Sequence, residues 1–228
     1  MKPIIVVRHA HPADKHIPVA AHWVDAVLSD LGLRQAECVA QRLKADLAGQ
    51  PCRIVSSDLQ RASQTAAAIG RALSVTVQTT PDLREYHGGL DAGVTEADLR
   101  QYVPAVSPPT EDLLANRAAE SWPHFYERVC GCMNRLTSDG DDRLLIVVAH
   151  FGSSGIILHW WLGIGLTPAG DTPFSFEVGL ASVSVLTAKP NGKHAVLRLN
   201  DGAHLYAANL ETISILSAPR PTVQGTQS

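Results

Sequence analysis

The chain alternates short aliphatic runs with longer stretches in which apolar positions recur at helical spacing. Residues 4–7 and 144–149 are continuous apolar runs rich in β-branched residues, which is typical of strands buried on both faces of a sheet. Val39, Leu43 and Leu47 share one face of an expected helix. The pattern predicts, in order, strand 4–7, helix 33–47, strand 53–56, a helix that is N-capped by Asp58 and ends at 73, strand 75–78, helix 121–136, strand 144–149, helix 152–162, and strands 183–186 and 195–199.

The order of these elements predicts the fold class. Strands that alternate with helices indicate an α/β fold, here a three-layer α/β/α sandwich with a mostly parallel central sheet. The last two strands follow each other directly, and the pair Asn191-Gly192 between them predicts a hairpin turn. We expect a single domain over residues 1–216 and a flexible tail at 217–228.

One long region interrupts the alternation of strands and helices. Residues 81–120 contain several prolines and one short helical signal at 95–102, which indicates a loop excursion at the edge of the sheet. Excursions of this length often carry function, so we expect this region to help shape a ligand site.

Composition narrows the class of protein further. Because 45% of the residues are hydrophobic and 18% are charged, the chain has enough apolar side chains for a core, which excludes a disordered protein. Nineteen Lys and Arg against 22 Asp and Glu give a net charge of −3, so we expect neither nucleic acid nor membrane as a partner. The first apolar run is too short for a signal peptide or a membrane span, and four cysteines are too few for a disulfide framework. We therefore expect a cytoplasmic protein with reduced thiols.

Candidate chemistry gathers at the ends of the best strands. Arg8 and His9 follow the first strand, and His150 follows the strand at 144–149. Arg61 lies in the first turn of the helix after the second strand, where exposed backbone N–H groups favour an anion. Because parallel strands end at one edge of a sheet, these side chains are predicted to converge there.

Each of these signals has a structural alternative. An Arg-His pair occurs by chance in a chain of this composition, and a histidine after a buried strand is more often a hydrogen-bonded structural residue than a catalyst. The conjunction of two histidines and two arginines at one sheet edge favours the functional interpretation.

Several sequence blocks then resemble one family. They are VVRHA, LSDLGLRQA, SSDLQRASQTA, Leu83-Arg84-Glu85 with its following glycines and Thr95, VVAHFG, and Asn200 with Ala203-His204-Leu205. Glu120-Ser121 with Arg128-Val129 matches a further helical segment. In this order, over residues from 4 to about 205, they resemble the histidine phosphatase (phosphoglycerate mutase-like) superfamily. The resemblance implies a phosphoglycerate mutase-like fold and a phosphohistidine intermediate on His9.

The residue types suit that chemistry. A neutral imidazole can attack a doubly negative phosphate ester without charge repulsion if its other ring nitrogen is fixed by a hydrogen bond, so His9 is the expected nucleophile. The planar guanidinium groups of Arg8 and Arg61 can each donate two hydrogen bonds to phosphate oxygens. A protonated His150 adds positive charge next to the phosphoryl group. Glu85 is the expected proton donor and acceptor, with pairing to Arg84 as the alternative. The mechanism needs neither metal nor cofactor.

Departures from the family pattern bear on the substrate. Lys15 stands where the family commonly has a phosphate-contacting Asn, His22 replaces a glycine, and Phe151 replaces the glycine after the second histidine. We expect these three residues to contribute to substrate binding. An alternative hypothesis is a metal site formed by the imidazoles of His9, His11, His16 and His22. No matching carboxylate or cysteine pattern accompanies these histidines.

Three hypotheses of function follow. The first is a metal-independent phosphatase that hydrolyses a small phosphorylated metabolite. The second is a cofactor-dependent phosphoglycerate mutase, but residues 96–120 contain only Arg100 and Arg117 as basic residues to hold a second anionic group, which favours hydrolysis. The third is a catalytically silent phosphate-binding protein, which the joint presence of the five candidate residues disfavours. Trp160 and Trp161 cannot share one helix face, and a loop or a homodimer contact is open for one of them.

Overall fold

A six-stranded sheet forms the centre of the molecule. The structure is a computed structural model that describes residues 3–13, 23, 25–87 and 120–210. The strands lie in the order β3-β2-β4-β1-β5-β6. Their bounds are β1 Ile4–Arg8, β2 Cys52–Ser57, β3 Val77–Thr80, β4 Leu144–Ala149, β5 Val183–Ala188 and β6 His194–Asp201.

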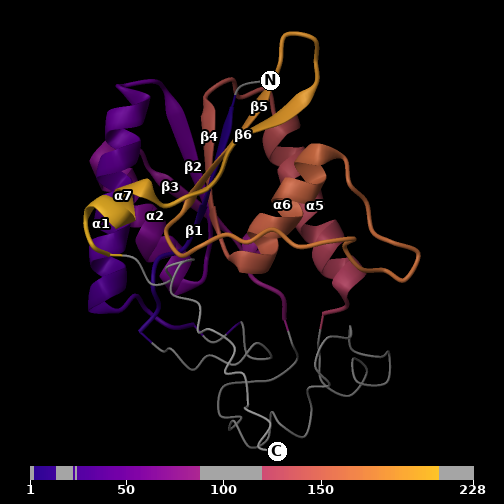
Figure 1. The fold of residues 1–228 in the computed structure, drawn as a ribbon, viewed down its shortest axis with the longest axis horizontal. Coiled ribbons are helices and arrows are strands. Elements are labelled where there is room, and N and C mark those ends of the chain that lie inside the picture. Colours follow the sequence, from indigo (N-terminus) through magenta and orange to yellow (C-terminus); the bar gives the residue numbers. More distant parts are fainter. Residues whose placement is uncertain (1–2, 14–22, 24, 88–119, 211–228) are drawn as a thin grey trace, which may run out of the picture.

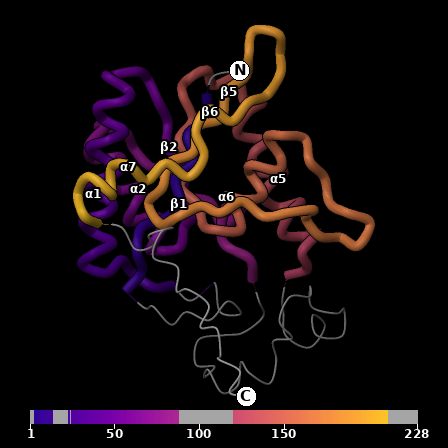
Figure 2. The backbone as a smooth tube through the Cα atoms, in the orientation of Figure 1, coloured from indigo at the N-terminus to yellow at the C-terminus, as the bar shows by residue number. Residues whose placement is uncertain are grey.

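The four strands from β3 to β1 pair in parallel, and β5 and β6 add an antiparallel edge. Figure 2 shows how the indigo β1 strand lies among elements from much later in the chain. The expected hairpin between the last two strands is present, with Gly192 at a positive φ of 79° in its turn. The prediction of an α/β sandwich with a mostly parallel sheet is confirmed.

Helices cover both faces of this sheet (Figure 1). On one face lie α1 and α2 with the short α7, and on the other face lie α5 and α6. Their bounds are α1 Asp30–Leu47, α2 Gln60–Leu73, α5 Trp122–Ser138, α6 Phe151–Leu162 and α7 Ala203–Ala207, and a 3-10 turn spans Pro81–Leu83. None of the helices in the described ranges is long and apolar enough to cross a membrane.

The pleat of the strands divides the core into two layers. Ile5 and Val7 of β1 pack in the cluster under α1 and α2, whereas Ile4 and Val6 pack in the cluster under α5 and α6. Every residue of β4 is buried, because this central strand has helices on both faces. Each fully buried aliphatic side chain contributes about 1.5–3 kcal/mol, which explains the continuous apolar runs of the sequence.

Two of the predicted elements start two or three residues away from their predicted first residue: β3 lies at Val77–Thr80, where the prediction is 75–78, and α1 starts early. Helix α1 begins at Asp30, three residues before the predicted start at 33, because Ser29 accepts the N–H of Gly32 as its N-cap.

The prediction that Asp58 caps α2 is wrong. Leu59 takes the N-cap position, and the Asp58 carboxylate instead accepts two hydrogen bonds from the Arg84 guanidinium, at 2.7 and 2.6 Å. This bidentate, charge-assisted pair uses both carboxylate oxygens of Asp58. The Gln60 N–H is taken by Asp25 Oδ1 at 2.5 Å.

The two adjacent tryptophans of α6 have different surroundings. Trp161 is fully buried and stacks on His194 with ring centroids 4.0 Å apart, while Trp160 donates through Nε1 to Asn134. A homodimer stays a prediction.

The described residues test only some of the remaining sequence predictions. The four cysteines are free thiols. The helical signal at 95–102 and the tail at 217–228 lie outside the described residues, so the domain bounds 1–216 also stay a prediction.

Candidate active site

Two histidines from neighbouring strands meet at the carboxyl edge of the sheet. His9 follows β1 and His150 follows β4, and these strands pair in parallel with Arg8 opposite Ala149. The centroids of the two imidazole rings are 5.0 Å apart, at an interplanar angle of 56°. His9 is 6% exposed and His150 is fully buried. The structure thus brings together the two rings that the sequence places 141 positions apart.

A hydrogen bond fixes the tautomer of His9. Its Nδ1 lies 2.8 Å from the carbonyl oxygen of Ala10, and a carbonyl can only accept, so Nδ1 carries the proton. In the neutral ring the lone pair is therefore on Nε2. Ala10 is itself held, because its N–H donates to Thr65 Oγ1 at 3.0 Å and Thr65 donates to the carbonyl of Arg61. The arrangement suits attack by Nε2.

Ser57 is a site residue that the sequence analysis did not select. It is the last residue of β2, and its buried hydroxyl lies 2.8 Å from Nε2 of His150. Because β2 pairs in parallel with β4, with Ser56 opposite Val148, Ser57 ends at the same edge as His150. The signal was present in the same strand-end argument that selected the histidines.

Two guanidinium groups lie close to these rings. Arg8 donates through Nη1 to the carbonyl of Val178 at 2.7 Å, and Arg61, in the first turn of α2, is 3% exposed. Burial lowers the pKa of both arginines, while the negative charge of Glu85 raises the pKa of both, and the positive charge of Arg8 further lowers the pKa of Arg61. A doubly negative group bound between them would offset this mutual repulsion.

The carboxylate of Glu85 is buried beside the arginines. The side chain is 5% exposed, and its two oxygens accept backbone N–H groups, Oε1 from Tyr86 at 3.0 Å and Oε2 from Gly152 at 2.9 Å. Arg84 pairs with Asp58, so the alternative that Glu85 is a solvated partner of Arg84 is wrong. The first turn of α6 therefore positions this carboxylate near the site.

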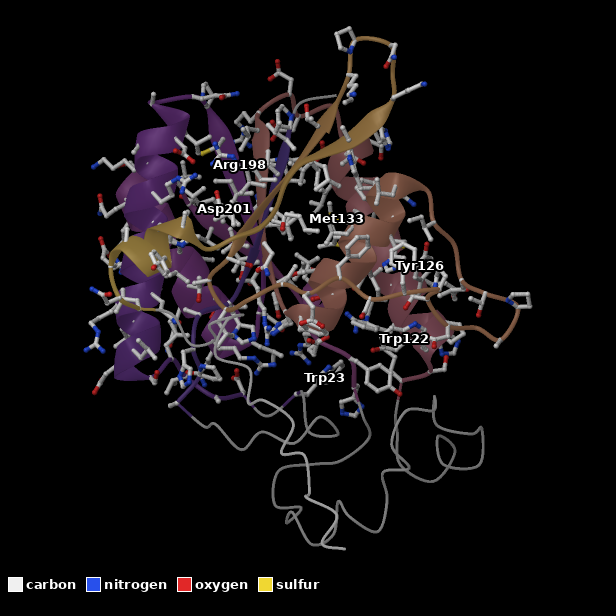
Figure 3. All side chains as sticks on the ribbon, viewed as in Figure 1. Trp23, Trp122, Tyr126, Met133, Arg198 and Asp201 are labelled. Carbon is white, nitrogen blue, oxygen red and sulfur yellow. The ribbon has the colours of Figure 1, made fainter. Side chains whose placement is uncertain are left out.

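The segment around Glu85 is anchored by its neighbours. Trp23 donates through Nε1 to the Glu85 carbonyl at 2.7 Å, and the Arg84 guanidinium lies over the Trp23 ring at 4.6 Å from its centroid. Arg128 of α5 donates to the carbonyl of Arg84 and forms a salt bridge with Glu120 at 2.7 Å. Figure 3 shows Trp23 at the lower edge of the ribbon, the edge where β1 ends.

Of the three residues predicted to bind substrate, the structure describes only one. Phe151 begins α6, and the Arg8 guanidinium lies over its ring at 5.1 Å from the centroid. Lys15 and His22 lie outside the described residues.

The histidine cluster that could hold a metal is also only partly described. His11 Nδ1 lies 2.9 Å from Ser29 Oγ, and His16 and His22 fall outside the described ranges. Within those ranges, no group of three or more His, Cys, Asp or Glu side chains could hold a metal ion.

Comparison with known proteins now adds to this geometry. Residues 4–202 match the family model of the histidine phosphatase superfamily (branch 1). The chain belongs to this superfamily. The family identification made from the sequence is confirmed.

Relatives of the chain include proteins named as phosphatases and proteins named as phosphoglycerate mutases or mutase-like. The chain is 33% identical over 139 residues to glucosyl-3-phosphoglycerate phosphatase of Mycobacterium tuberculosis, covering 57% of this chain and 61% of that protein. It is 27% identical over 154 residues to the metal-independent phosphoserine phosphatase of Arabidopsis thaliana, covering 65% of this chain and 64% of that protein. The chain thus spans less than two thirds of the length of both relatives.

The same fold is present in a solved structure. The native structure of mycobacterial glucosyl-3-phosphoglycerate phosphatase superposes with a TM-score of 0.69 at 25% identity, covering 88% of this chain and 99% of that chain. This histidine phosphatase fold is the one that the sequence resemblance implies, and it agrees with the α/β class that the alternation of strands and helices predicts.

Proposed function

We propose that the protein is a metal-independent phosphomonoester hydrolase that acts on a small phosphorylated metabolite through a phosphohistidine intermediate on His9. The observation that carries the proposal is the meeting of the His9 and His150 rings at 5.0 Å, with the half-buried Arg8 directly before His9. The buried Arg61 lies near enough to Arg8 and Glu85 for their charges to shift its pKa. Related phosphatases with small phosphorylated substrates in their names support the choice of hydrolysis.

The first chemical step uses the His9 tautomer. Nε2 attacks phosphorus while the ester P–O bond breaks, and the Nδ1 hydrogen bond to Ala10 stabilises the ring as it gains positive charge. Arg8 and Arg61 hold the non-bridging oxygens, and His150, hydrogen-bonded to Ser57, adds a donor where charge accumulates.

Proton transfer falls to Glu85. In the first step its carboxyl group gives a proton to the leaving alkoxide. In the second step a water molecule attacks the phosphohistidine, Glu85 accepts the proton of that water, and the N–P bond breaks to release inorganic phosphate.

The same reaction separates the alternatives. A mutase would return the phosphoryl group to its substrate and would need cations for a second anionic group, and a silent protein would bind phosphate without forming a covalent intermediate.

We propose a cytoplasmic location, which the four free thiols support. We also propose Lys15 and His22 as further substrate contacts.

The test measures hydrolysis of p-nitrophenyl phosphate by the purified protein after EDTA treatment. We expect turnover without metal, phosphate on His9 in rapidly quenched protein by mass spectrometry, and a loss of about a thousandfold or more in His9→Ala. The exposed His124 on α5 offers the matched control His124→Ala, which should keep wild-type activity.

Two outcomes would overturn the proposal. EDTA-sensitive turnover contradicts the metal-independent mechanism. Interconversion of 2- and 3-phosphoglycerate that is faster than phosphate release, with bisphosphoglycerate present, assigns the protein to the mutases instead.

A further inference from the structure

An apolar cavity of about 50 Å³ lies beside the candidate active site, along the first two turns of α6. Phe151, Gly152, Gly155 and His159 form its helical wall, at positions that share one face of the helix. The chain that leads from α6 to β5 forms the opposite wall with Phe174 and Phe176. We call this cavity the α6 groove; in Figure 1 its second wall is the orange segment that crosses α6.

Glycine at position 155 keeps the groove open. A Cβ atom built at Gly155 has no heavy atom within 4 Å, so the position faces empty space. Glycine in a helix interior costs stability relative to alanine, and no close approach of a neighbouring group requires it here. The glycine at position 155 therefore leaves open space beside the helix, where a larger side chain would fill the groove.

A buried acceptor lies in the wall of the groove. His159 is 2% exposed, and its ring packs against Phe174 and Phe176 with centroids 5.1 and 5.0 Å apart. Its Nδ1 lies 2.9 Å from the carbonyl oxygen of Gly155, so Nδ1 is the donor and Nε2 of the neutral ring is an acceptor. Within the described part of the chain, Nε2 has no hydrogen-bond partner. A buried acceptor of this kind is unfavourable until a ligand supplies a donor.

A buried donor accompanies this acceptor. Trp122, at the start of α5, lines the same groove, and its Nε1 also lacks a hydrogen-bond partner among the residues that the structure describes. Figure 3 shows Trp122 near the edge of the sheet where Trp23 lies. A hydroxyl group has one donor hydrogen and two acceptor lone pairs, so it is the simplest group that suits both nitrogens.

The groove adjoins the phosphate site directly. Phe151, which lines the groove, lies under the Arg8 guanidinium, and Gly152, which also lines it, donates its N–H to Glu85. Among the described residues, the lining contains no Lys or Arg that could pair with a second anionic group. Its aromatic walls instead favour an apolar chain.

We propose that the α6 groove binds the alcohol part of the substrate, and that this part is a short apolar arm ending in a hydroxyl group that donates to His159 Nε2. The inference rests on the proposed function only for the position of the phosphoryl group against Arg8. It names the substrate class as phosphate monoesters of short hydroxylated alkyl or aryl alcohols.

The test measures binding, so that it does not depend on catalysis. Isothermal titration calorimetry compares methylphosphonate with a series of ω-hydroxyalkylphosphonates of increasing chain length and with their methyl-terminated counterparts, in mildly alkaline buffer that keeps imidazoles neutral. One chain length is expected to bind best, with the hydroxylated ligand about fivefold tighter than its methyl-terminated counterpart. In His159→Phe, which keeps a ring but removes the acceptor, this fivefold preference should disappear.

Filling the groove provides the second measurement. Gly155→Leu should weaken the best hydroxyalkylphosphonate about tenfold and leave methylphosphonate affinity unchanged, and Gly155→Ala should have a smaller effect in the same direction. Gly131→Leu on α5 is the matched control, because a Cβ there meets only the end of the Arg135 side chain at 3.4 Å.

The outcomes separate this inference from the proposed function. Equal affinity for hydroxylated and methyl-terminated ligands, or an unchanged affinity in Gly155→Leu, overturns the subsite even if the protein hydrolyses phosphate esters. Selective binding in a protein that shows no turnover supports the subsite and contradicts the hydrolase.

Discussion

The main-chain N–H of Gly152 donates a hydrogen bond of 2.9 Å to Oε2 of Glu85, 67 positions earlier in the chain. This contact joins the first turn of α6, which begins after His150, to the segment that carries the proposed proton donor. Only a glycine leaves room for it, because a Cβ at position 152 would lie 2.4 Å from Glu85 Oε1 and 3.1 Å from the Phe125 ring. The absence of a side chain here therefore defines where the carboxylate lies.

Replacing this glycine is expected to displace the carboxylate without touching the nucleophile. In Gly152→Ala the new methyl group and the Glu85 oxygen cannot both keep their positions, so kcat for an alkyl phosphate should fall about a hundredfold, since proton transfer by a positioned group contributes about 10²–10⁴. Steady-state kinetics with vanadate inhibition measures this, and the vanadate affinity should change little because Arg8 and Arg61 stay in place.

Gly131→Ala is the control for this substitution, since it makes the same change in a helix interior without meeting Glu85. Wild-type kcat in Gly152→Ala would show that Glu85 does not need this position for catalysis.

The role of Glu85 itself predicts a dependence on the leaving group. Glu85→Gln keeps the shape of the side chain but cannot donate the proton that an alkoxide needs. Its kcat should fall about 10²–10⁴-fold for an alkyl phosphate and much less for p-nitrophenyl phosphate, whose phenolate leaves without protonation. The ratio of the two rates is the measurement.

The exposed Glu127 on α5 provides the comparison for this charge change. Glu127→Gln should preserve the wild-type ratio, and an equal loss on both substrates in Glu85→Gln would assign the residue a role in binding or structure instead.

Much of this site follows from the ends of strands. His9 and His150 come directly after aliphatic runs that are typical of buried parallel strands, and neighbouring parallel strands end at one edge. The sequence therefore predicts their proximity without any knowledge of the side-chain contacts. Arg61 follows from the same reasoning, one helix turn after β2.

The contacts that the sequence could not predict depend on tertiary pairing. Nothing local distinguishes Asp58 as a partner of Arg84 from Asp58 as a helix cap, because both use the same carboxylate. Likewise, Gly152 resembles a flexible helix start until Glu85 is placed against it. Pairings across tens of residues are set by packing, so spacing along the chain does not show them.

Ser57 provides a test of the histidine that adds positive charge. In Ser57→Ala the hydroxyl that lies 2.8 Å from His150 Nε2 is lost, and a hydrogen bond of this kind to a charged ring contributes about 1.5–3 kcal/mol. We expect kcat/KM to fall about tenfold to a hundredfold. The measurement is kcat/KM as a function of pH. Because the charged form of His150 loses a hydrogen-bond partner, the fall in kcat/KM that accompanies loss of its proton should move to lower pH.

A neighbouring serine serves as the control for Ser57→Ala. Ser56 Oγ donates to the Ser57 carbonyl and not to a histidine, so Ser56→Ala should leave the pH profile unchanged. An unshifted profile in Ser57→Ala would mean that Ser57 does not support the charge of His150 and serves a structural role, such as accepting the Leu59 N–H.

His204 predicts how stability depends on pH. Its Nε2 lies 3.0 Å from the Ala181 carbonyl and therefore donates, and the Ala181 N–H donates to the carbonyls of Arg8 and His9, so the ring supports the end of β1. Burial lowers the pKa of His204 below 6.5 and outweighs the hydrogen bond to the Ala181 carbonyl, which raises it. The positive charge of Arg42 lowers this pKa further, while the negative charges of Asp201 and Asp46 raise it.

The sign of the effect follows from proton linkage. Since the folded state binds the proton of His204 less readily than the unfolded state, this contribution to stability is complete above about pH 6.5 and is lost as the pH falls from there through the lowered folded pKa. His204→Gln retains a donor for Ala181 but does not titrate, so its urea midpoint should fall less than that of the wild type over this interval. The exposed His124 gives the control His124→Gln, whose urea midpoint should change with pH as that of the wild type does. If the urea midpoints of wild type and His204→Gln change in parallel with pH, His204 accepts its proton in the folded state without a cost in stability.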